Sequence, residues 1–375
     1  MSDGLNRLPF AHRLVAAALL WLIGTAALAA DSLTDYRRTL FVSGRDSTAL
    51  IAIDIDADAV SGRLELGLLP REIQVSQTGG WMAVIDRQQP RVVVVDLSQR
   101  GVRSLPLPLI PTRLRISPDG GIVAAIDDRS GAIVLIDPAQ ARETARLEGP
   151  AAIRDAMFST DGKALLVAAD SIDGIAVYDV ATAALATIIA GDPVRALIGA
   201  PNGREAYALT APPQRTILHI DLRSRTLLGR LRAANAGALY PSRSGNHLML
   251  LDPDAGLLSL VPAQPLAQGV ALPGAVGASE VYGAWFDTVA FVASRAQPKL
   301  LVYDLERRQP GAAILLSGAP GAGVVAPDGE KLYLPIAERH EVAVIDANLR
   351  RSIGAVAVEF APLQAVIAGG YGLCH

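Results

Sequence analysis

Short apolar runs that end in aspartate return along the chain at a nearly constant interval, as in VVVVD at residues 92–96 and IVLID at residues 133–137. The closing aspartates lie 42, 41, 42, 42, 83 and 42 residues apart, and the interval of 83 contains a copy at residues 257–262 without its aspartate. A period near 42 indicates a repeat protein. The eight copies end at Asp54, Asp96, Asp137, Asp179, Asp221, Pro262, Asp304 and Asp346.

A tight-turn sequence recurs with the same interval, for example SPDG at residues 117–120 and APNG at residues 200–203. Asp-Gly and Asn-Gly close hairpins because these residues tolerate a positive φ. One copy lacks the turn and has AWFD at residues 284–287 instead. The turns begin at Ser76, Ser117, Ser159, Ala200, Ser242 and Ala326.

Each unit contains four apolar runs, named A to D here; in the third unit they cover residues 113–117, 121–126, 132–137 and 145–149. The runs are nearly continuous in apolar residues, as expected for strands packed on both faces. A solenoid of alternating strands and helices would need helical windows of about ten residues, and the sequence has none. The pattern predicts an all-β, eight-bladed β-propeller with four-stranded blades.

The two ends of the chain each carry part of one unit. After the first 30 residues the runs at 39–44, 49–54 and 62–66 correspond to strands B, C and D, and the last run, at 362–370, corresponds to a strand A. Together they complete one blade, and closing the ring in this way removes exposed sheet edges. We expect residues 30–375 to form a single propeller domain.

The N-terminus has the layout of a secretory signal. Arg7 and Arg13 precede an apolar run at residues 14–29 that ends in the small-x-small triplet Ala-Leu-Ala. The run is shorter than the roughly 20 residues of a membrane span. We expect residues 1–29 to be a signal peptide and the protein to be periplasmic, without a membrane span after cleavage; an uncleaved anchor is the alternative.

Composition and net charge argue against nucleic acid as a partner. The chain is 51% hydrophobic and 5% aromatic, which suits a β protein built on Val, Ile, Leu and Ala, and its net charge of -3 gives no basis for binding nucleic acid. Cys374 is the single cysteine, so an intramolecular disulfide is excluded. We expect a monomer.

Arginines mark one part of the predicted ring. In a propeller the D–A and B–C loops share one face, where strands A begin at the mouth of the central channel. Arg71, Arg154 and Arg195 lie five residues before the A–B turn of their units, and Arg113 lies four before. A one-residue step reverses the face of a strand, so Arg113 does not match the other three. The other units have Gly237, Ser279, Gly321 and Pro362 at this place.

The B–C loops add basic side chains to the same face. Guanidinium groups suit carboxylates and phosphates, so the pattern indicates an anionic ligand or a partner protein, with Arg71, Arg113, Arg154, Arg195, Arg45 and Arg339 as binding residues. The alternative is that the arginines pair with acidic residues of their own loops. The loop arginines are Arg45, Arg87, Arg129, Arg215, Arg295 and Arg339, and the acidic residues are Asp46, Asp127, Asp128, Asp155, Asp170, Asp173, Asp252 and Glu338.

Other chemistry has little support in the sequence. His340 is the one internal histidine in a loop of the predicted ligand face, where it could act as a haem ligand, as an acid or base, or as a plain surface residue. No metal-ligand spacing and no nucleophile motif occurs, so nothing favours catalysis. The C-terminal YGLCH has a tyrosine at the first cysteine position of a c-type haem motif, and we interpret it as a frayed end.

The units at residues 194–231 and 323–354, with their APNG and APDG turns and the runs ILHID and VAVID, resemble the YVTN-type β-propeller repeat. An exported propeller of eight blades is also similar to the haem d-one (cytochrome d-one-like) family. That resemblance implies a tetrapyrrole such as haem d1, with propionates on the arginines and His340 as a candidate haem ligand.

Three functions remain open from the sequence. The first is a binding or scaffold propeller, not an enzyme, with an arginine-rich channel mouth for an acidic ligand or a partner protein. The second is a haem d-one-type protein, in haem d-one maturation or resembling nitrite reductase. The third is an accessory subunit of a periplasmic dehydrogenase.

Overall fold

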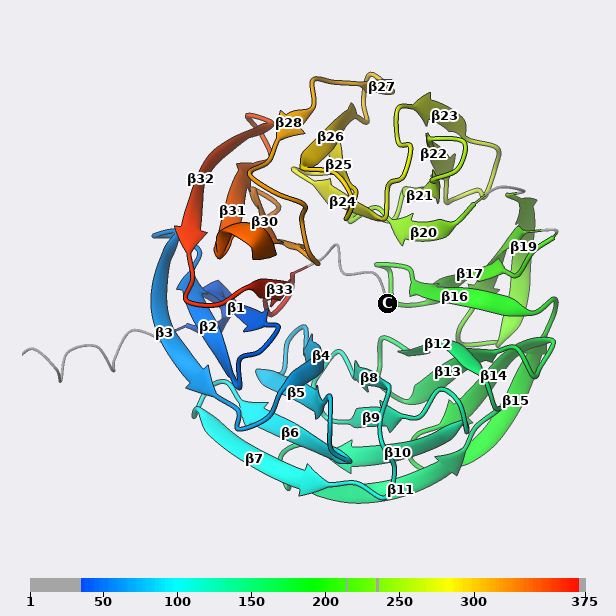
Figure 1. The fold of residues 1–375 in the computed structure, drawn as a ribbon. Helices are drawn as coiled ribbons and strands as arrows, with labels where there is room; N and C mark the ends of the chain where they lie inside the picture. Colours follow the sequence, from blue (N-terminus) through cyan, green and yellow to red (C-terminus); the bar gives the residue numbers. More distant parts are fainter. Residues whose placement is uncertain (1–34, 214, 234–235, 371–375) are drawn as a thin grey trace, which may run out of the picture.

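Eight antiparallel sheets surround a central axis (Figure 1). The computed structural model describes residues 35–213, 215–233 and 236–370. In each sheet the strand nearest the axis is A and the outermost is D, so the predicted eight-bladed propeller of four-stranded blades is confirmed. The predicted signal peptide at residues 1–29 and the YGLCH terminus lie outside the described residues.

The strands of the first four blades are given from the axis outward. Blade 1 has β33 (Pro362–Val366), β1 (Thr39–Gly44), β2 (Ala49–Asp54) and β3 (Ala59–Glu65); blade 2 has β4 (Pro70–Val75), β5 (Trp81–Asp86), β6 (Arg91–Asp96) and β7 (Gly101–Pro106); blade 3 has β8 (Arg113–Ile116), β9 (Val123–Ile126), β10 (Ala132–Asp137) and β11 (Arg142–Glu148); blade 4 has β12 (Ile153–Phe158), β13 (Ala164–Ala169), β14 (Gly174–Asp179) and β15 (Ala184–Ala190).

The second half of the ring follows the same order. Blade 5 has β16 (Val194–Gly199), β17 (Glu205–Thr210), β18 (Thr216–Asp221) and β19 (Thr226–Arg232); blade 6 has β20 (Ala238–Pro241), β21 (His247–Asp252), β22 (Leu257–Pro262) and β23 (Val270–Pro273); blade 7 has β24 (Glu280–Ala284), β25 (Val289–Ala293), β26 (Lys299–Asp304), β27 (Gln309–Pro310) and β28 (Ile314–Leu315); blade 8 has β29 (Val324–Val325), β30 (Lys331–Ile336), β31 (Glu341–Asp346) and β32 (Arg351–Ala357).

Blade 7 departs from the repeat in two places. Its outer strand is divided, so that β26 pairs with both β27 and β28, and Pro310 ends the first piece because proline donates no ladder hydrogen bond. The missing A–B turn is replaced by Trp285, Phe286 and Asp287, which all have positive φ.

The core lies between the blades, as β6 illustrates. Val93 and Val95 pack toward blade 1, whereas Val92 and Val94 pack toward blade 3, and all four are at most 1% exposed. Each buried valine contributes roughly 1.5–3 kcal/mol relative to an exposed one. The continuous apolar runs are therefore strands with two buried faces.

The repeated aspartates build the C–D turns. Asp96 Oδ1 accepts hydrogen bonds from the backbone N–H groups of Ser98 (3.0 Å) and Gln99 (3.1 Å), and Asp346 does the same for Leu349 at 2.7 Å. Side-chain acceptors of this kind hold the chain in a turn. These residues belong to the scaffold, as expected for a feature found in almost every blade.

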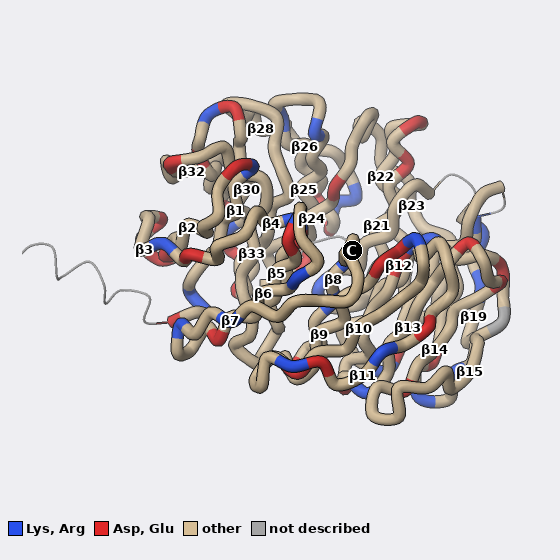
Figure 2. Tube along the Cα trace, turned by 60° about the horizontal axis from the view of Figure 1, so that its bottom comes forward, with Lys and Arg blue, Asp and Glu red and all other residues tan. Residues whose placement is uncertain are grey.

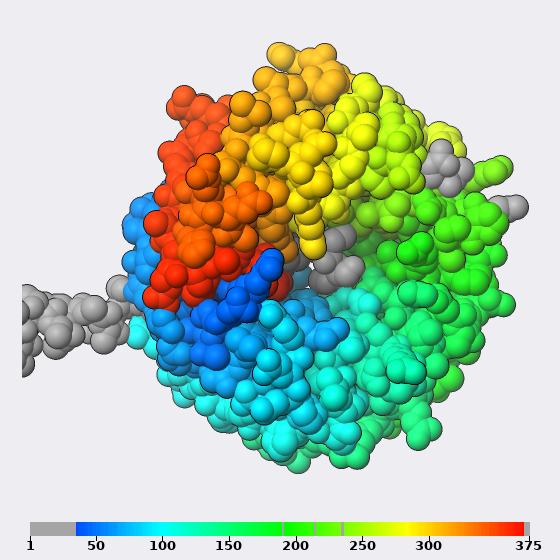
Figure 3. Space-filling view, viewed as in Figure 1, coloured from blue at the N-terminus to red at the C-terminus, as the bar shows by residue number. Residues whose placement is uncertain are grey.

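The ring closes where β33 pairs with β1, so the first and last strands of the described chain lie side by side in blade 1 (Figure 3). A polar clasp ties blade 8 to blade 1 at the C–D turn of blade 1. The buried Tyr333 hydroxyl donates to Asp58 Oδ1 at 2.7 Å, and Lys331 Nζ donates to Asp58 Oδ2 at 2.7 Å and to the Ile55 carbonyl at 2.9 Å. Burial first, and the Asp58 carboxylate second, raise the pKa of Tyr333.

The helical segments of the described chain are η1 (Tyr36–Arg38) and η2 (Ala337–Arg339). Each is a 3-10 turn of three residues, and neither could cross a membrane.

The clasp generates a stability prediction. Tyr333→Phe removes a hydrogen bond to a carboxylate, and we expect a loss of about 1.5–3 kcal/mol in the free energy of unfolding. Tyr303→Phe is the matched control, because its buried hydroxyl donates to a neutral acceptor, the Pro273 carbonyl, at 3.0 Å; it should cost about 1 kcal/mol. Denaturant unfolding with an unchanged m-value measures both, and equal losses would contradict a special role for the clasp.

Candidate functional site

Three of the predicted arginines occupy β-bulges. The register between strands A and B skips one residue in blades 2, 4 and 5, and these residues are Arg71, Arg154 and Arg195. A bulge leaves its extra residue out of the ladder and re-aims the side chain. All three arginines are exposed. We call them the bulge arginines.

Arg113 occupies a different position. The ladder of blade 3 is regular there, with Arg113 opposite Ile126. Arg113 lies four residues before its turn at Ser117, as Glu72 lies four before Ser76, so these two residues are equivalent. The one-residue mismatch seen in the sequence is therefore real.

In blade 1, which closes the ring, the position expected to match Arg71 is not Pro362. The bulged residue there is Leu363, because Ser43 pairs with Gln364 and Gly44 with Pro362. Pro362 itself stays in the ladder, so it is not the equivalent of Arg71. The chain has no Asp-Gly turn after β33 from which this position could be counted.

Strands A have a free edge, and side chains of the preceding blade supply hydrogen bonds to it. Glu72 Oε2 in β4 accepts from the Leu114 N–H in β8 at 2.9 Å. Asp155 Oδ2 in β12 accepts from the Leu197 N–H in β16 at 2.8 Å. Both contacts join residues 42 apart, which is one repeat. An unpaired buried N–H costs about as much as a lost hydrogen bond, so these carboxylates stabilise the channel wall.

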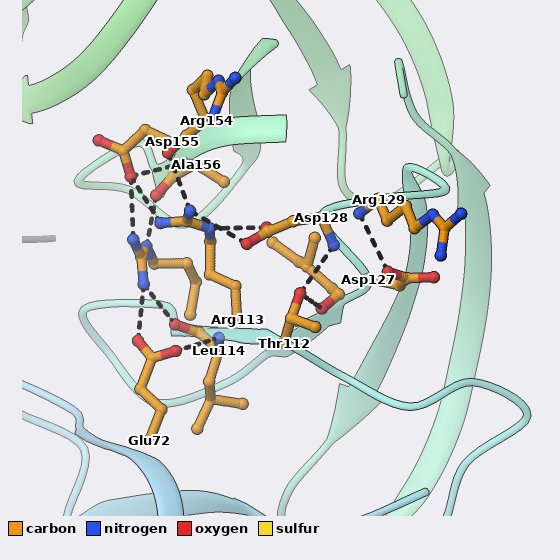
Figure 4. A network of polar contacts seen from close by, with 12 residues as sticks. Glu72, Thr112, Arg113, Leu114, Asp127, Asp128, Arg129, Arg154, Asp155 and Ala156 are labelled. Atoms are coloured by element: carbon orange, nitrogen blue, oxygen red, sulfur yellow. Dashed lines mark hydrogen bonds and ion pairs between the residues drawn. The ribbon is translucent and has the colours of Figure 1, made fainter. Parts of the chain in front are cut away.

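Arg115 connects three blades at the centre of this arrangement, and its partners Glu72 and Asp155 are labelled in Figure 4. Its side chain is 5% exposed and donates to Glu72 Oε1 and Asp155 Oδ1, both at 3.0 Å. Its Nε donates to the Ala156 carbonyl in β12 at 2.5 Å. Since a buried charge is tolerated only when it is paired and hydrogen-bonded, Glu72 and Asp155 make Arg115 possible at this place.

Arg113 joins the same arrangement closer to the channel mouth. Its guanidinium binds Asp128 through two contacts of 2.8 and 3.2 Å and donates to the Arg154 carbonyl at 2.9 Å. Burial opposes the charge, but Asp128 and Asp155 outweigh it and raise the pKa of Arg113. Arg113 therefore fixes the main chain at the bulge of blade 4. We call Glu72, Arg113, Arg115, Asp128 and Asp155 the inter-blade network.

The bulge arginines differ in their partners. Arg154 forms an ion pair with Asp170, and both side chains are exposed. Its hydrogen bond lowers the pKa of Asp170, and the charge of Arg195 acts in the same direction. Arg195 makes no hydrogen bond or ion pair with any other described residue. Arg71 Nε donates to the Thr112 carbonyl at 3.4 Å, which is a weak contact.

The remaining predicted residues lie in B–C loops. Arg45 is exposed in blade 1, and within the described chain its guanidinium has no partner. In blade 8, Arg339 Nε donates to the Ser317 carbonyl at 3.1 Å, and the exposed His340 ends η2 with φ 54°. Blade 8 stands opposite blade 4 in a ring of eight, so Arg339 and His340 are across the channel mouth from Arg154 and Asp170.

The channel mouth carries charges of both signs. Basic and acidic positions alternate over the loops instead of forming one field (Figure 2). The network arginines are occupied, whereas Arg71 and Arg195 have no carboxylate partner among the described residues. In the same part of the chain, no three His, Cys, Asp or Glu side chains form a group that could hold a metal ion.

Sequence reasoning missed the structural half of the site. Arg115 and Glu72 were not selected, and Asp155 and Asp128 were considered only as partners that might neutralise a surface arginine. The signal was available: Glu72, Arg113 and Asp155 all lie four residues before the turns at Ser76, Ser117 and Ser159. What that position does became clear only from the hydrogen bonds between blades.

The fold and this channel mouth define an eight-bladed β-propeller with a charged network in blades 2 to 4 and exposed arginines on bulges beside it. No family model matches the chain, and no curated protein matches it significantly. Solved structures do match, at identities that show the fold alone.

The solved structures that match include a dehydrogenase, AztD and a synthase. The dihydro-haem d1 dehydrogenase NirN, solved in complex with DHE, is 14% identical with a TM-score of 0.75, covering 90% of this chain and 76% of that one. Apo AztD from Citrobacter koseri is 14% identical with a TM-score of 0.67, covering 89% and 98%. Hydrazine synthase from Kuenenia stuttgartiensis is 15% identical with a TM-score of 0.58, covering 74% and 95%. The chain thus resembles cytochrome d1-type and AztD propellers in architecture.

The network predicts unequal effects for two aspartates. Asp155→Ala removes one of the two carboxylates that pair with Arg115 and the acceptor of the Leu197 N–H. We therefore expect a loss of about 3–5 kcal/mol in the free energy of unfolding. Asp170→Ala breaks only the exposed pair with Arg154 and should cost less than about 1 kcal/mol. Denaturant titration of both variants decides the point. Similar losses of stability in the two variants would mean that the inter-blade network does not stabilise the channel wall.

Proposed function

We propose that this protein is an exported, non-enzymatic binding propeller whose channel-mouth face takes a carboxylate-bearing ligand or the acidic surface of a partner protein. The bulges in blades 2, 4 and 5 carry the proposal. The ladders between named strands A and B skip four residues, and three of these four are arginine, on the face where the A strands begin. Arginine binds carboxylates in a two-pronged geometry, which makes it suited to this task.

The exposed pair Arg154–Asp170 supports an exchange of partners. An ion pair between exposed side chains contributes about 0–1 kcal/mol, so an incoming carboxylate can replace Asp170 at small cost. An ordinary aspartate is already ionised at neutral pH, and Arg154 lowers the pKa of Asp170 further. Salt, rather than a change of pH near neutrality, should therefore weaken both the pair and the binding.

Arg113 supports the same proposal by fixing the backbone beneath Arg154. It holds the Arg154 carbonyl while its own charge is balanced by Asp128 and Asp155. The bulge backbone is thereby held rigid, so binding orders fewer groups and loses less conformational entropy.

An acidic peptide tests the proposal. We expect a fluorescein-labelled oligoglutamate to bind in an anisotropy assay, with affinity that falls as salt rises. Arg71→Ala combined with Arg195→Ala should weaken binding about tenfold, because two exposed charge contacts are worth about 0.5–1 kcal/mol each.

The control changes net charge equally on the opposite face. Arg223 and Arg307 are exposed in C–D turns, and Arg223→Ala with Arg307→Ala should leave the affinity of the peptide nearly unchanged. Equal weakening by both double variants would show attraction to overall charge, and the absence of binding at low salt would refute an anion-binding face.

A second candidate, a tetrapyrrole-binding protein of the haem d-one type, is favoured by the structural likeness to NirN. The donor set suits such a ligand: His340 offers an exposed imidazole in blade 8, and the bulge arginines offer partners for propionates across the mouth. A bound haem would supply the redox and ligand-binding chemistry. An accessory role beside a periplasmic dehydrogenase would appear as co-purification with a redox protein.

Iron protoporphyrin IX is the probe for this candidate. If the candidate holds, micromolar haem should bind with a shifted Soret band, His340→Ala should abolish the shift, and Arg195→Ala should weaken binding several-fold. His247→Ala, in β21 at the opposite face, is the control and should leave the spectrum unchanged. An unshifted Soret band, or a shift that survives His340→Ala, excludes this mode of haem binding.

A further inference from the structure

The outer strand of every blade has one edge without a strand partner. Such an edge presents unpaired N–H and C=O groups and can pair with another chain. Soluble proteins suppress this by placing charges, proline or short strands at the edge. The outer strands of this ring therefore show where pairing is blocked and where it is allowed.

In seven blades the outer strand contains a residue that prevents edge pairing. Their outer strands contain a charged residue or a proline: Arg63 and Glu65 in β3, Arg103 and Pro106 in β7, Arg142 to Glu148 in β11, Arg230 and Arg232 in β19, Pro273 in β23, Pro310 in β27 and Arg351 in β32.

Blade 4 is the exception. β15 (Ala184–Ala190), ALATIIA, is seven residues long and contains no charge, proline or glycine. The uncharged stretch extends over residues 180–191. Leu185 and Ile188 are 51% and 46% exposed, although other positions of the strand pack inward, such as Ile189 at 5%. β15 lies at the outer rim of the ring (Figure 1). It is thus a long apolar edge strand without a charge or a proline, although its ladder with β14 skips Ala186 in a β-bulge.

We propose that β15 is a dimerisation edge that pairs antiparallel with β15 of a second copy of this chain, joining two blades into one continuous sheet. A two-fold axis perpendicular to the sheet must pass between a residue and its own copy. The centre of the seven-residue strand is Thr187. Pairing about Thr187 sets the two threonines face to face, and threonine pairs across strands are favourable.

Charge favours a second copy as the occupant. Antiparallel self-pairing brings identical side chains close to the axis, so any charge at the centre of the strand would meet its own kind. β15 has none. The nearest charged residues in the chain, Asp179 and Asp192, lie beyond its ends, and pairing about Thr187 places Asp192 near Thr182 rather than near another carboxylate. Asp192 also has Arg230 of its own chain at 3.5 Å.

This inference departs from the monomer expected from the sequence. The edge depends on which run is strand D and on which of its residues are exposed. The inference is also independent of the anionic face, because β15 is at the rim and the bulge arginines are at the channel mouth.

Sedimentation velocity of the full chain over a wide concentration range tests the proposal. We expect a monomer–dimer equilibrium, and Ile188→Lys should raise the dimer dissociation constant at least about tenfold by placing two uncompensated charges in the paired edge. The matched control is Leu228→Lys in β19, since Leu228 is 52% exposed on the neighbouring outer strand. It should leave the dissociation constant unchanged.

A cross-link tests the register. Thr187→Cys in a Cys374→Ser background should form a disulfide dimer on mild oxidation, because directly opposed strand residues have Cα atoms within disulfide range. Leu228→Cys in the same background should stay monomeric in its denatured, non-reducing form. A chain that is monomeric at all concentrations overturns the proposal. So does a dimer that resists Ile188→Lys, as association through residues 14–29 would, or that gives no Thr187→Cys cross-link.

Discussion

The free edge of a β-strand is the constraint on which this structure depends. A propeller closes its ring of blades, yet each four-stranded sheet still ends in an inner and an outer edge strand. At the inner edge, backbone N–H groups of β8 and β16 face the preceding blade. Hydrogen bonds from side chains one repeat away satisfy them, as Glu72 does for Leu114 and Asp155 for Leu197.

The charged network follows from that constraint. Carboxylates placed to bind backbone N–H groups need counter-charges once they are buried, and Arg115 supplies one between Glu72 and Asp155. Arg113 continues the chain of contacts to the channel mouth, where it fixes the bulge that carries Arg154. Structural and exposed arginines thus stand side by side, and only the exposed ones are available to a ligand.

At the outer edges, the residue types of the strand itself prevent pairing with another chain. Charges and prolines interrupt seven of the outer strands, while β15 has neither. A similar contrast separates repeated from variable positions elsewhere in the ring. The aspartates that end strands C recur in nearly all blades and only shape turns, whereas the bulge arginines and the bare edge of β15 occur where the blades differ.

The sequence by itself determined the architecture, because a period of 42 and the Asp-Gly turns are local signals that appear in copy after copy. It also determined that strands B, C and D of blade 1 lie at one end of the chain and strand A at the other. It could not separate Arg113 from the bulge arginines by role, nor show that Arg115 is buried. Those facts depend on the register of each ladder and on contacts between residues 40 to 43 positions apart, and only the closed ring brings such residues together.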